Sequence, residues 1–414
     1  QGTAMYKLLG LTTEIGPVFG WCDNYDLFIA SPNGTKSTHA MVSEFTVHPS
    51  RIEDTKKPNI GVMSITIPRL KKSQVNRVQI KEQDLLHYTG PRKVIPPVMN
   101  PQPLSDELNI KLNNSVTNAN RRDAAFFSQV LLPESIEYSG FNAKEDREER
   151  KDAKPKTLFV FGPLLNSPPS HPDTMLTTMH HLSTSMHEFG MQYANISLDL
   201  QLYIVASQIK WSDQNRWKSV LLHPGMMHTL MSFLGCIGNL MKSSGMEVVL
   251  ASAYGSLKSI LSGKAWPQAL RAYRMLTVAL LNDLLSEGPK SYDEMMQYID
   301  GKCNHPTAKL WIDCLIRSTF IAHRFLRAER EGDLLLREKS IEEMLPYFFS
   351  AGHCNYARYL TFYLQEVRSL SEDIRKLLMQ GCTCRHSNGS TAVSSDQFGE
   401  QTYIKQGKGA RGLK

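Results

Sequence analysis

The stretch Asn195–His228, NISLDLQLYIVASQIKWSDQNRWKSVLLHPGMMH, decides the fold that we expect. It opens with an apolar run that predicts a strand and that ends at an acid, Asp199. A helix-like run follows, then a second predicted strand at Ser219–His223, and a Pro-Gly break opens a long helical region. An acid at the carboxyl end of a strand lies where side chains from neighbouring strands converge. The question is which other acids of the chain meet Asp199 there.

Length and composition bound the answer. The chain of 414 residues has room for one or two domains, and its apolar share of 41% supports a core and argues against disorder. A net charge of +7 suits a polyanionic partner such as DNA without requiring one. No run of 18 apolar residues predicts a membrane span, and no signal peptide is visible.

The cysteines bear on the compartment. The chain has 7 of them, an odd count at irregular spacing, which indicates reduced thiols rather than a disulfide framework. We therefore expect a nuclear or cytoplasmic protein. The chain starts at Gln1 and stops in GKGARGLK, so we expect a fragment cut at both ends, from which targeting signals are missing.

The first part of the chain is rich in strand patterns. Three β-rich runs follow one another and predict a meander. They are Val18–Ile29, Ala40–Val47 and Gly61–Ile67. The first carries two acids, Asp23 and Asp26. Residues 68–120 are rich in Pro, Asn and Lys and are expected to form a long surface excursion, with a short helix at Arg121–Leu132.

The pattern then alternates. Thr157–Leu165 predicts a strand, His171–Gly190 has a helical period, and Met191–Leu198 is the strand that delivers Asp199. Residues 224–380 are almost all helical. One apolar stripe of that region is made of Leu230, Phe233, Ile237 and Met241. A final helix is expected at Ser395–Gln406.

These elements predict an α/β fold with a ribonuclease H-like mixed sheet and a large all-α insertion. We expect residues 1–223 to form the core, with a long loop at 68–156. Residues 224–380 form the helical insertion, and residues 381–414 supply the final core helix and a basic tail.

The ribonuclease H fold has one acid on its first strand, one at the end of its fourth strand and one on a late helix. This chain has acids at all three places: Asp23 or Asp26, then Asp199, then Asp396 and Glu400. Two hard cations, Mg²⁺ or Mn²⁺, held by such carboxylates clamp the attacking and leaving oxygens of a phosphodiester. The metal ligands expected are Asp23, Asp199 and Glu400.

Five segments are long and distinctive: DNYDLF, SLDLQLY, LHPGMMHTLMSFLGCIGNLMKSSG, SAGHCNYARYL and DQFGEQTYIKQGKG. They resemble a widespread family of proteins carried by mobile elements in animal genomes, from about residue 15 to the end. More distantly, the layout is similar to hAT-like and Mutator-like DDE transposases. That resemblance implies that Asp199, His228 and Glu400 take the places of the second acid, a histidine and the third acid. Met226 and Met227 stand where those enzymes have a cysteine–histidine pair.

Each signal also has a structural interpretation. Asp23 and Asp26 can cap a strand turn, Asp199 can cap the following helix, and Asp396 and Glu400 can belong to a solvated helix face. His228 on a Met- and Leu-rich helix is more often a packing residue.

Two further motifs have the same ambiguity. The spacing Cys382-x-Cys384-x-His386 suggests Zn²⁺, with Cys354 or His353 as a fourth ligand, although it departs from common zinc patterns. A basic tail follows the last predicted helix and is either a DNA-backbone contact or solvated. Its residues are Lys405, Lys408 and Arg411.

Three function classes follow. The first is a metal-dependent transposase or nuclease that cleaves and joins DNA. The second is a domesticated or decayed relative that binds nucleic acid or protein partners without catalysis. The third is a structural protein that uses the helical half as a scaffold. The sequence leaves the oligomeric state open, and a homo-oligomer is one of the states it allows.

Overall fold

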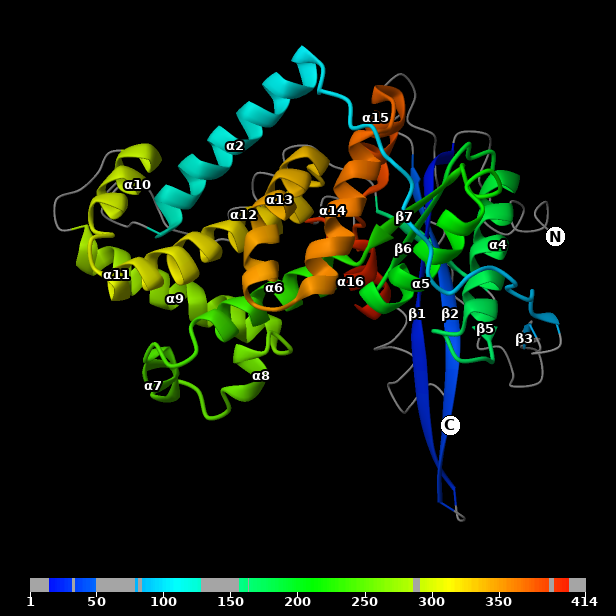
Figure 1. Ribbon diagram of the computed structural model, residues 1–414, viewed down its shortest axis with the longest axis horizontal. Coiled ribbons are helices and arrows are strands. Elements are labelled where there is room, and N and C mark those ends of the chain that lie inside the picture. The colour runs from blue at the N-terminus through cyan, green and yellow to red at the C-terminus, as the bar shows by residue number, and fades with distance from the viewer. Residues whose placement is uncertain are drawn as a thin grey trace, which may run out of the picture. The chain divides into compact units, whose positions relative to one another are not determined.

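The computed structural model of this chain describes most of its residues and divides into two compact units. The described ranges are 15–31, 34–49, 79–80, 84–127, 156–162, 164–285, 291–386 and 391–401. Unit 1 comprises residues 1–97, 155–223 and 399–414, and unit 2 comprises residues 98–154 and 224–398. Unit 1 is mixed α/β and unit 2 is helical (Figure 1).

Unit 1 is built on a mixed sheet. Its strands are β1 (Ile15–Ser31), β2 (Gly34–Pro49), β3 (Gln79–Ile80), β4 (Leu158–Phe161), β5 (Leu164–Leu165), β6 (Ala194–Leu198) and β7 (Val220–Pro224). They lie in the order β3-β5-β2-β1-β6-β7, with β4 also paired to β2. The central strand β1 is antiparallel to β2 and parallel to β6. The predicted adjacency of the first strand and the strand that ends at Asp199 is confirmed.

The sheet elements follow from the sequence pattern. The predicted strands Val18–Ile29 and Ala40–Val47 lie inside β1 and β2, which form a ribbon that extends past the rest of the sheet (Figure 1). The predicted strand Gly61–Ile67 lies outside the described residues. Two helices, α4 (Pro172–Glu188) and α5 (Leu200–Ser212), pack on the sheet.

One glycine makes the packing of α4 on β1 close. A Cβ on Gly20 of β1 would lie only 3.0 Å from the terminal methyl of Met186 on α4. Part of the core of unit 1 therefore lies between α4 and the face of the sheet on which Gly20 lies. Successive residues of β1 alternate between the two faces of the sheet.

Unit 2 consists of helices packed on one another through apolar side chains. The helices are α2 (Asp106–Phe127), α6 (Met226–Leu240), α7 (Met246–Ala251), α8 (Lys258–Leu261), α9 (Trp266–Leu284), α10 (Tyr292–Gly301), α11 (Pro306–Trp311), a π-helical segment (Ile312–Arg317), α12 (Ser318–Glu331), α13 (Leu334–Ser350), α14 (Cys354–Arg368), α15 (Glu372–Gly381) and α16 (Ser395–Gly399). The stripe predicted on α6 is buried as expected: the exposed fraction of Leu230 is 4%, and that of Phe233, Ile237 and Met241 is 0%.

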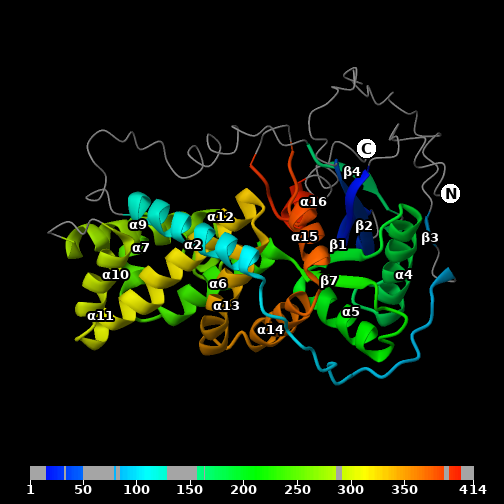
Figure 2. The same ribbon diagram turned by 90° about the horizontal axis from the view of Figure 1, so that it is seen from above.

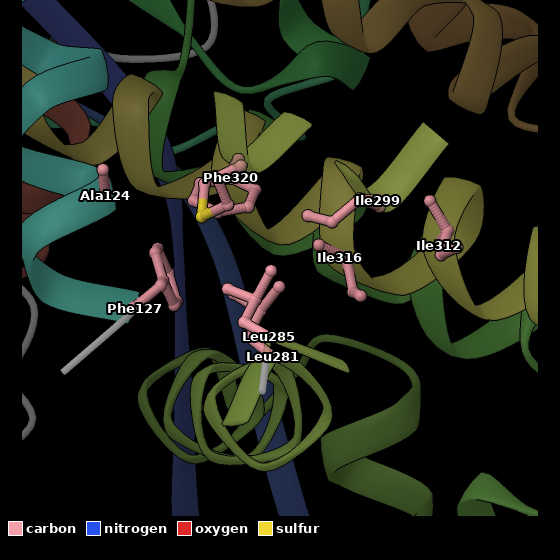
Figure 3. Close-up of a cluster of buried hydrophobic side chains, with 9 residues drawn as sticks. Ala124, Phe127, Leu281, Leu285, Ile299, Ile312, Ile316 and Phe320 are labelled. Atoms are coloured by element: carbon pink, nitrogen blue, oxygen red, sulfur yellow. The ribbon is translucent and has the colours of Figure 1, made fainter. Parts of the chain in front are cut away.

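A second apolar cluster joins helices far apart in the sequence. Figure 3 shows its side chains, which come from α2, α9, α10, the π-helical segment and α12. The buried members are Ala124, Phe127, Leu281, Leu285, Met295, Ile299, Ile312, Ile316 and Phe320.

The excursion expected over residues 68–120 is wrong in its second half. The chain forms α2 from Asp106 to Phe127, and this helix belongs to unit 2, where it contacts α12 and α13 (Figure 2). The helix has few apolar residues, and ion pairs rather than an apolar stripe hold much of its buried face. The buried carboxylate of Asp123 accepts hydrogen bonds from Arg327 at 2.7 Å and from His323 at 2.9 Å.

The final helix expected at Ser395–Gln406 begins where predicted. α16 spans Ser395–Gly399, and Glu400 and Gln401 continue it in a wider π-type turn. Residues 402–406 of the prediction lie outside the described residues. Among the helices that the structure describes, none is long and apolar enough to cross a membrane.

Candidate functional site

Two acids of unit 1 are brought together by the register of parallel strands. β1 pairs with β6 from Phe19↔Asn195 to Cys22↔Leu198. The next residue on each strand is an acid, Asp23 on β1 and Asp199 after β6. Both acids therefore lie side by side at the point where the pairing of β1 with β6 stops, although β1 itself continues to Ser31.

The electrostatics of the neighbouring thiol support this placement. Burial raises the pKa of the Cys22 thiol well above its ordinary value, and the negative charges of Asp23 and Asp199 raise it further. The carboxylates of Asp23 on β1 and Asp199 after β6 are therefore both close enough to the buried Cys22 sulfur to influence it electrostatically.

Each of the two carboxylates also has a local structural role. Asp23 is only 6% exposed, and its Oδ1 accepts a hydrogen bond from the backbone N–H of Asn24 at 2.7 Å. Asp199 is the N-cap of α5, and its Oδ1 accepts from the backbone N–H of Leu202 at 2.7 Å. The structural interpretation of Asp199 as a helix cap is thus correct, and a cap does not exclude ligation because a carboxylate has about four acceptor positions.

Glu400 lies in the same unit, next to the segment that covers Trp21. A Cβ on Gly399 would lie 2.7 Å from the indole ring of Trp21, so the backbone of Gly399 rests against that ring. Trp21 is buried and precedes Asp23 by two positions, and residues two apart on a strand share a face. Glu400, which is half-buried, therefore follows a residue that sits on the Asp23 face of β1.

Sequence reasoning missed polar residues on this face of the sheet. Glu44 of β2 is fully buried and lies opposite Trp21 in the register. On the side of β1 opposite to β2, His223 of β7 and Asn195 of β6 are both buried, and His223 Nε2 is 3.1 Å from Asn195 Oδ1. The available signal was an acid, Glu44, inside an alternating apolar strand, which is costly unless it has a partner or a function.

The donor set matches a hard cation in kind, since carboxylates are the ligands that Mg²⁺ and Mn²⁺ take. It does not match in number. In the part of the chain that the structure describes, no group of three or more His, Cys, Asp or Glu side chains is arranged to hold a metal ion. The expected set Asp23, Asp199 and Glu400 is therefore a pair of neighbouring carboxylates with a third in the same unit.

The zinc motif does not form a site within the described ranges either. Cys384 is buried and its backbone forms a β-bridge with Val393, while His386 stacks on Phe398 with ring centroids 4.6 Å apart. The proposed ligands Cys382, Cys384 and His386 thus have packing roles, as their unusual spacing allows.

Four predicted residues fall outside what the structure describes. Asp26 pairs with His39 in the β1–β2 register, but its side chain is not described. Lys405, Lys408 and Arg411 follow the last described residue, Gln401.

Asp396 and His228 form a separate cluster in unit 2. The Asp396 carboxylate is 1% exposed; its Oδ2 lies 3.0 Å from His228 Nδ1 and accepts from the backbone N–H of His228 at 3.1 Å. Its Oδ1 accepts from the backbone N–H of Met227 at 3.2 Å. These are the first N–H groups of α6, whose own N-cap, Gly225, has no side chain. Asp396 therefore caps α6 from a distant part of the chain.

The protonation of Asp396 reflects these contacts. Burial alone raises the pKa of its carboxyl, but the hydrogen bond and charge of His228, with bonds from Ser394 and Met227, outweigh burial and leave the pKa below its ordinary value. The capping role accounts for an acid at this position without catalysis. Asp396 is thus engaged with α6, whereas Glu400 follows the last residue of α16, Gly399.

Comparison with known proteins identifies a family but no activity. A family model described as a domain of unknown function (DUF8702) matches residues 137–300 and 289–414, a region that includes Asp199, His228, Asp396 and Glu400 but not Asp23. No curated protein and no solved structure matches the chain. Because the match spans more than half of the chain, the protein belongs to the DUF8702 family.

Proposed function

We propose that unit 1 is a ribonuclease H-like core related to DDE transposases, carried by a protein of mobile-element origin. The support is topological. Across the sheet, β4 pairs with β2 and β2 pairs with β1, both antiparallel. On the other side of β1 lies β6, which is parallel to it, and β7 lies beyond β6. In the ribonuclease H layout the first and fourth strands lie side by side in this way, and the insertion between the second and third acids is helical, as α6 to α15 are here.

We further propose that the protein cleaves and joins phosphodiester bonds of DNA with Mg²⁺ or Mn²⁺. One observation carries this proposal: the register Cys22↔Leu198, which makes Asp23 and Asp199 neighbours where the pairing of β1 with β6 stops. Two adjacent carboxylates repel each other, so a divalent cation between them is favourable. Glu400, beside Trp21 through Gly399, is the third acid proposed. We propose a nuclear location because that is where a DNA substrate lies, and the net charge of +7 favours a polyanion.

The test uses a substitution that leaves the helix cap intact. Asparagine caps helices about as well as aspartate, so Asp199→Asn keeps the bond to Leu202 N–H and removes only the charge. The matched control is Asp213→Asn, because exposed Asp213 makes a similar bond to the backbone N–H of Arg216 at 3.1 Å. We expect cleavage of labelled DNA in Mn²⁺ to fall at least about 100-fold in Asp199→Asn and to be unchanged in Asp213→Asn. Equal cleavage by the Asp199→Asn variant and wild type would remove Asp199 from the mechanism.

A second candidate function is DNA binding without catalysis, as in a domesticated or decayed transposase. The lack of a three-ligand group among the described residues favours it. DNA that is bound by folded wild-type protein, yet left intact in both Mg²⁺ and Mn²⁺, would select this candidate.

A further inference from the structure

Helix α2 presents a long polar face to solvent. Its buried side holds Leu108, Ala119, Asp123 and Phe127, and the opposite side is exposed. The exposed residues recur at intervals of three and four, so they share one face of the helix. They include Ile110, Lys111, Asn114, Asn118 and Arg121. An open hollow of about 460 Å³ runs along this face, lined by Glu107, Ile110, Lys111, Asn114, Ser115 and Asn118.

The helix that carries this face is firmly anchored within unit 2. Asp123 is bonded to Arg327 and His323, and all three side chains are buried. About two turns earlier, the hydroxyl of Ser115 donates to Asp333 at 2.5 Å. These bonds hold α2 against α12 and the start of α13. The exposed side chains of α2 therefore project from a well-anchored backbone, as a selective binding surface requires.

The composition of the exposed face is unusual for a helix that only meets water. α2 contains five asparagines, and asparagine is among the weaker helix formers, whereas Glu, Lys and Gln would serve a solvated face better. Asn113 and Asn114 have no hydrogen-bond partner within the described residues. Asn118 accepts only from Arg121, at 3.3 Å. Each of these amides offers a donor and an acceptor to a ligand.

The pattern fits duplex DNA. A major groove admits an α-helix; an Asn amide makes a paired contact with the N6 and N7 atoms of adenine, Arg contacts guanine, and Lys contacts phosphate. The one acid lining the hollow, Glu107, has a partner in Lys376, whose Nζ lies 3.5 Å from it. The face from Lys111 to Arg121 is thus cationic and rich in amides.

We propose that this face of α2 enters the major groove of duplex DNA, with Asn114 and Asn118 on base edges and Lys111 on the backbone. This inference rests on the proposed function, because the duplex is the substrate proposed there, and it adds a source of sequence preference. The contact requires neither metal nor the carboxylates of unit 1.

The experiment measures binding in EDTA, so that it does not depend on cleavage. Duplexes with a randomised segment are selected on the full chain, and the selected and a scrambled duplex are then titrated by fluorescence anisotropy at fixed salt. The double variant Asn114→Ala with Asn118→Ala should bind the selected duplex at least about 10-fold more weakly and the scrambled duplex unchanged. Its matched control is Asn282→Ala, an exposed asparagine on α9.

The phosphate contact has a different signature. Lys111→Ala should weaken binding to both duplexes equally and lower the slope of log affinity against log salt by about 1. Circular dichroism verifies that each variant is folded. An unchanged sequence preference in the double variant would overturn the proposal, and so would a wild-type chain that binds single strands only or no DNA. A chain that reads a sequence but cuts nothing contradicts the proposed cleavage alone.

Discussion

Removing the carboxylate of Asp396 tests the cap that it places on α6. The substitution Asp396→Ala takes away the acceptor for the backbone N–H groups of Met227 and His228 and for the His228 ring. Gly225, the N-cap residue of α6, offers no side chain as a replacement. Water can reach the site only partly, since the His228 side chain is 27% exposed and that of Asp396 is 1% exposed.

The magnitude follows from the bonds lost. A hydrogen bond to a charged group contributes about 1.5–3 kcal/mol, and loss of an N-cap costs about 0.5–2 kcal/mol. Both N–H groups lose their acceptor in this variant, and water replaces it only in part. We therefore expect the substitution to lower the free energy of opening α6 by about 3 kcal/mol. Asp396→Asn keeps one acceptor oxygen and should cost about half as much.

Hydrogen exchange followed by mass spectrometry measures this locally, which matters because a chain with two units need not unfold in one step. About 3 kcal/mol corresponds to exchange faster by about 100-fold in the peptide at residues 226–233. A change below about threefold would refute the cap. The pKa of Asp396 is lowered on folding, so its contribution is present above about pH 3.8 and is lost as the pH falls through the folded-state value.

A double-mutant cycle verifies that the contact itself is measured. A Cβ on Gly225 would lie 2.7 Å from Asp396 Oδ2, so Gly225→Ala should destabilise the wild type by about 1 kcal/mol and the Asp396→Ala variant by less. Additive effects would show that the two positions do not meet.

Three other perturbations have expected outcomes. Gly238→Ala on α6 should lower the urea midpoint by the equivalent of about 2 kcal/mol, because its Cβ would clash with the backbone packed on it, whereas the control Gly301→Ala, with nothing within 4 Å, should be neutral or stabilising. Burial, chiefly, lowers the pKa of His323 to about 3, so stability should be lost between pH 6.5 and 3, and His323→Asn should flatten that slope in urea titrations at stepped pH. Arg375→Met leaves the carboxylate of Glu338 buried and should cost about 3 kcal/mol in urea unfolding, and adding Glu338→Leu should recover part of it.

The strands and the acid pair were predictable because their signals are local. An apolar run followed by an acid occurs at Asp23 and again at Asp199, and it marks the end of β6 but not that of β1, which continues to Ser31. Adjacency in space then needed only the assumption that the two strands are parallel neighbours, which the register of β1 and β6 bears out.

Most of helix α2, from Asp106 to Asn120, was missed because its burial is not apparent from its own residues, and only the end at Arg121–Phe127 falls in the predicted helix Arg121–Leu132. Its apolar period is weak, and the partners that make Asp123 a buried residue are Arg327 and His323, some 200 positions away. A sequence window sees only a polar, Asn-rich segment, for which a loop is the ordinary interpretation. The cap of α6 by Asp396 was hidden in the same way, since the acid lies 168 positions after His228 in the first turn of α6.

Asp199 shows why its structural and functional interpretations are compatible. A helix that begins directly after a strand needs an N-cap at the edge where metal-binding acids of this fold class are expected, so one carboxylate can serve both purposes. Its Oδ1 is used by Leu202 N–H, and the helix dipole of α5 stabilises the negative charge that a cation also requires. Capping is therefore compatible with ligation, because a carboxylate has about four acceptor positions. Repulsion between the adjacent carboxylates of Asp23 and Asp199, not the presence of either acid alone, is therefore the reason for the metal-dependent function that we propose for unit 1.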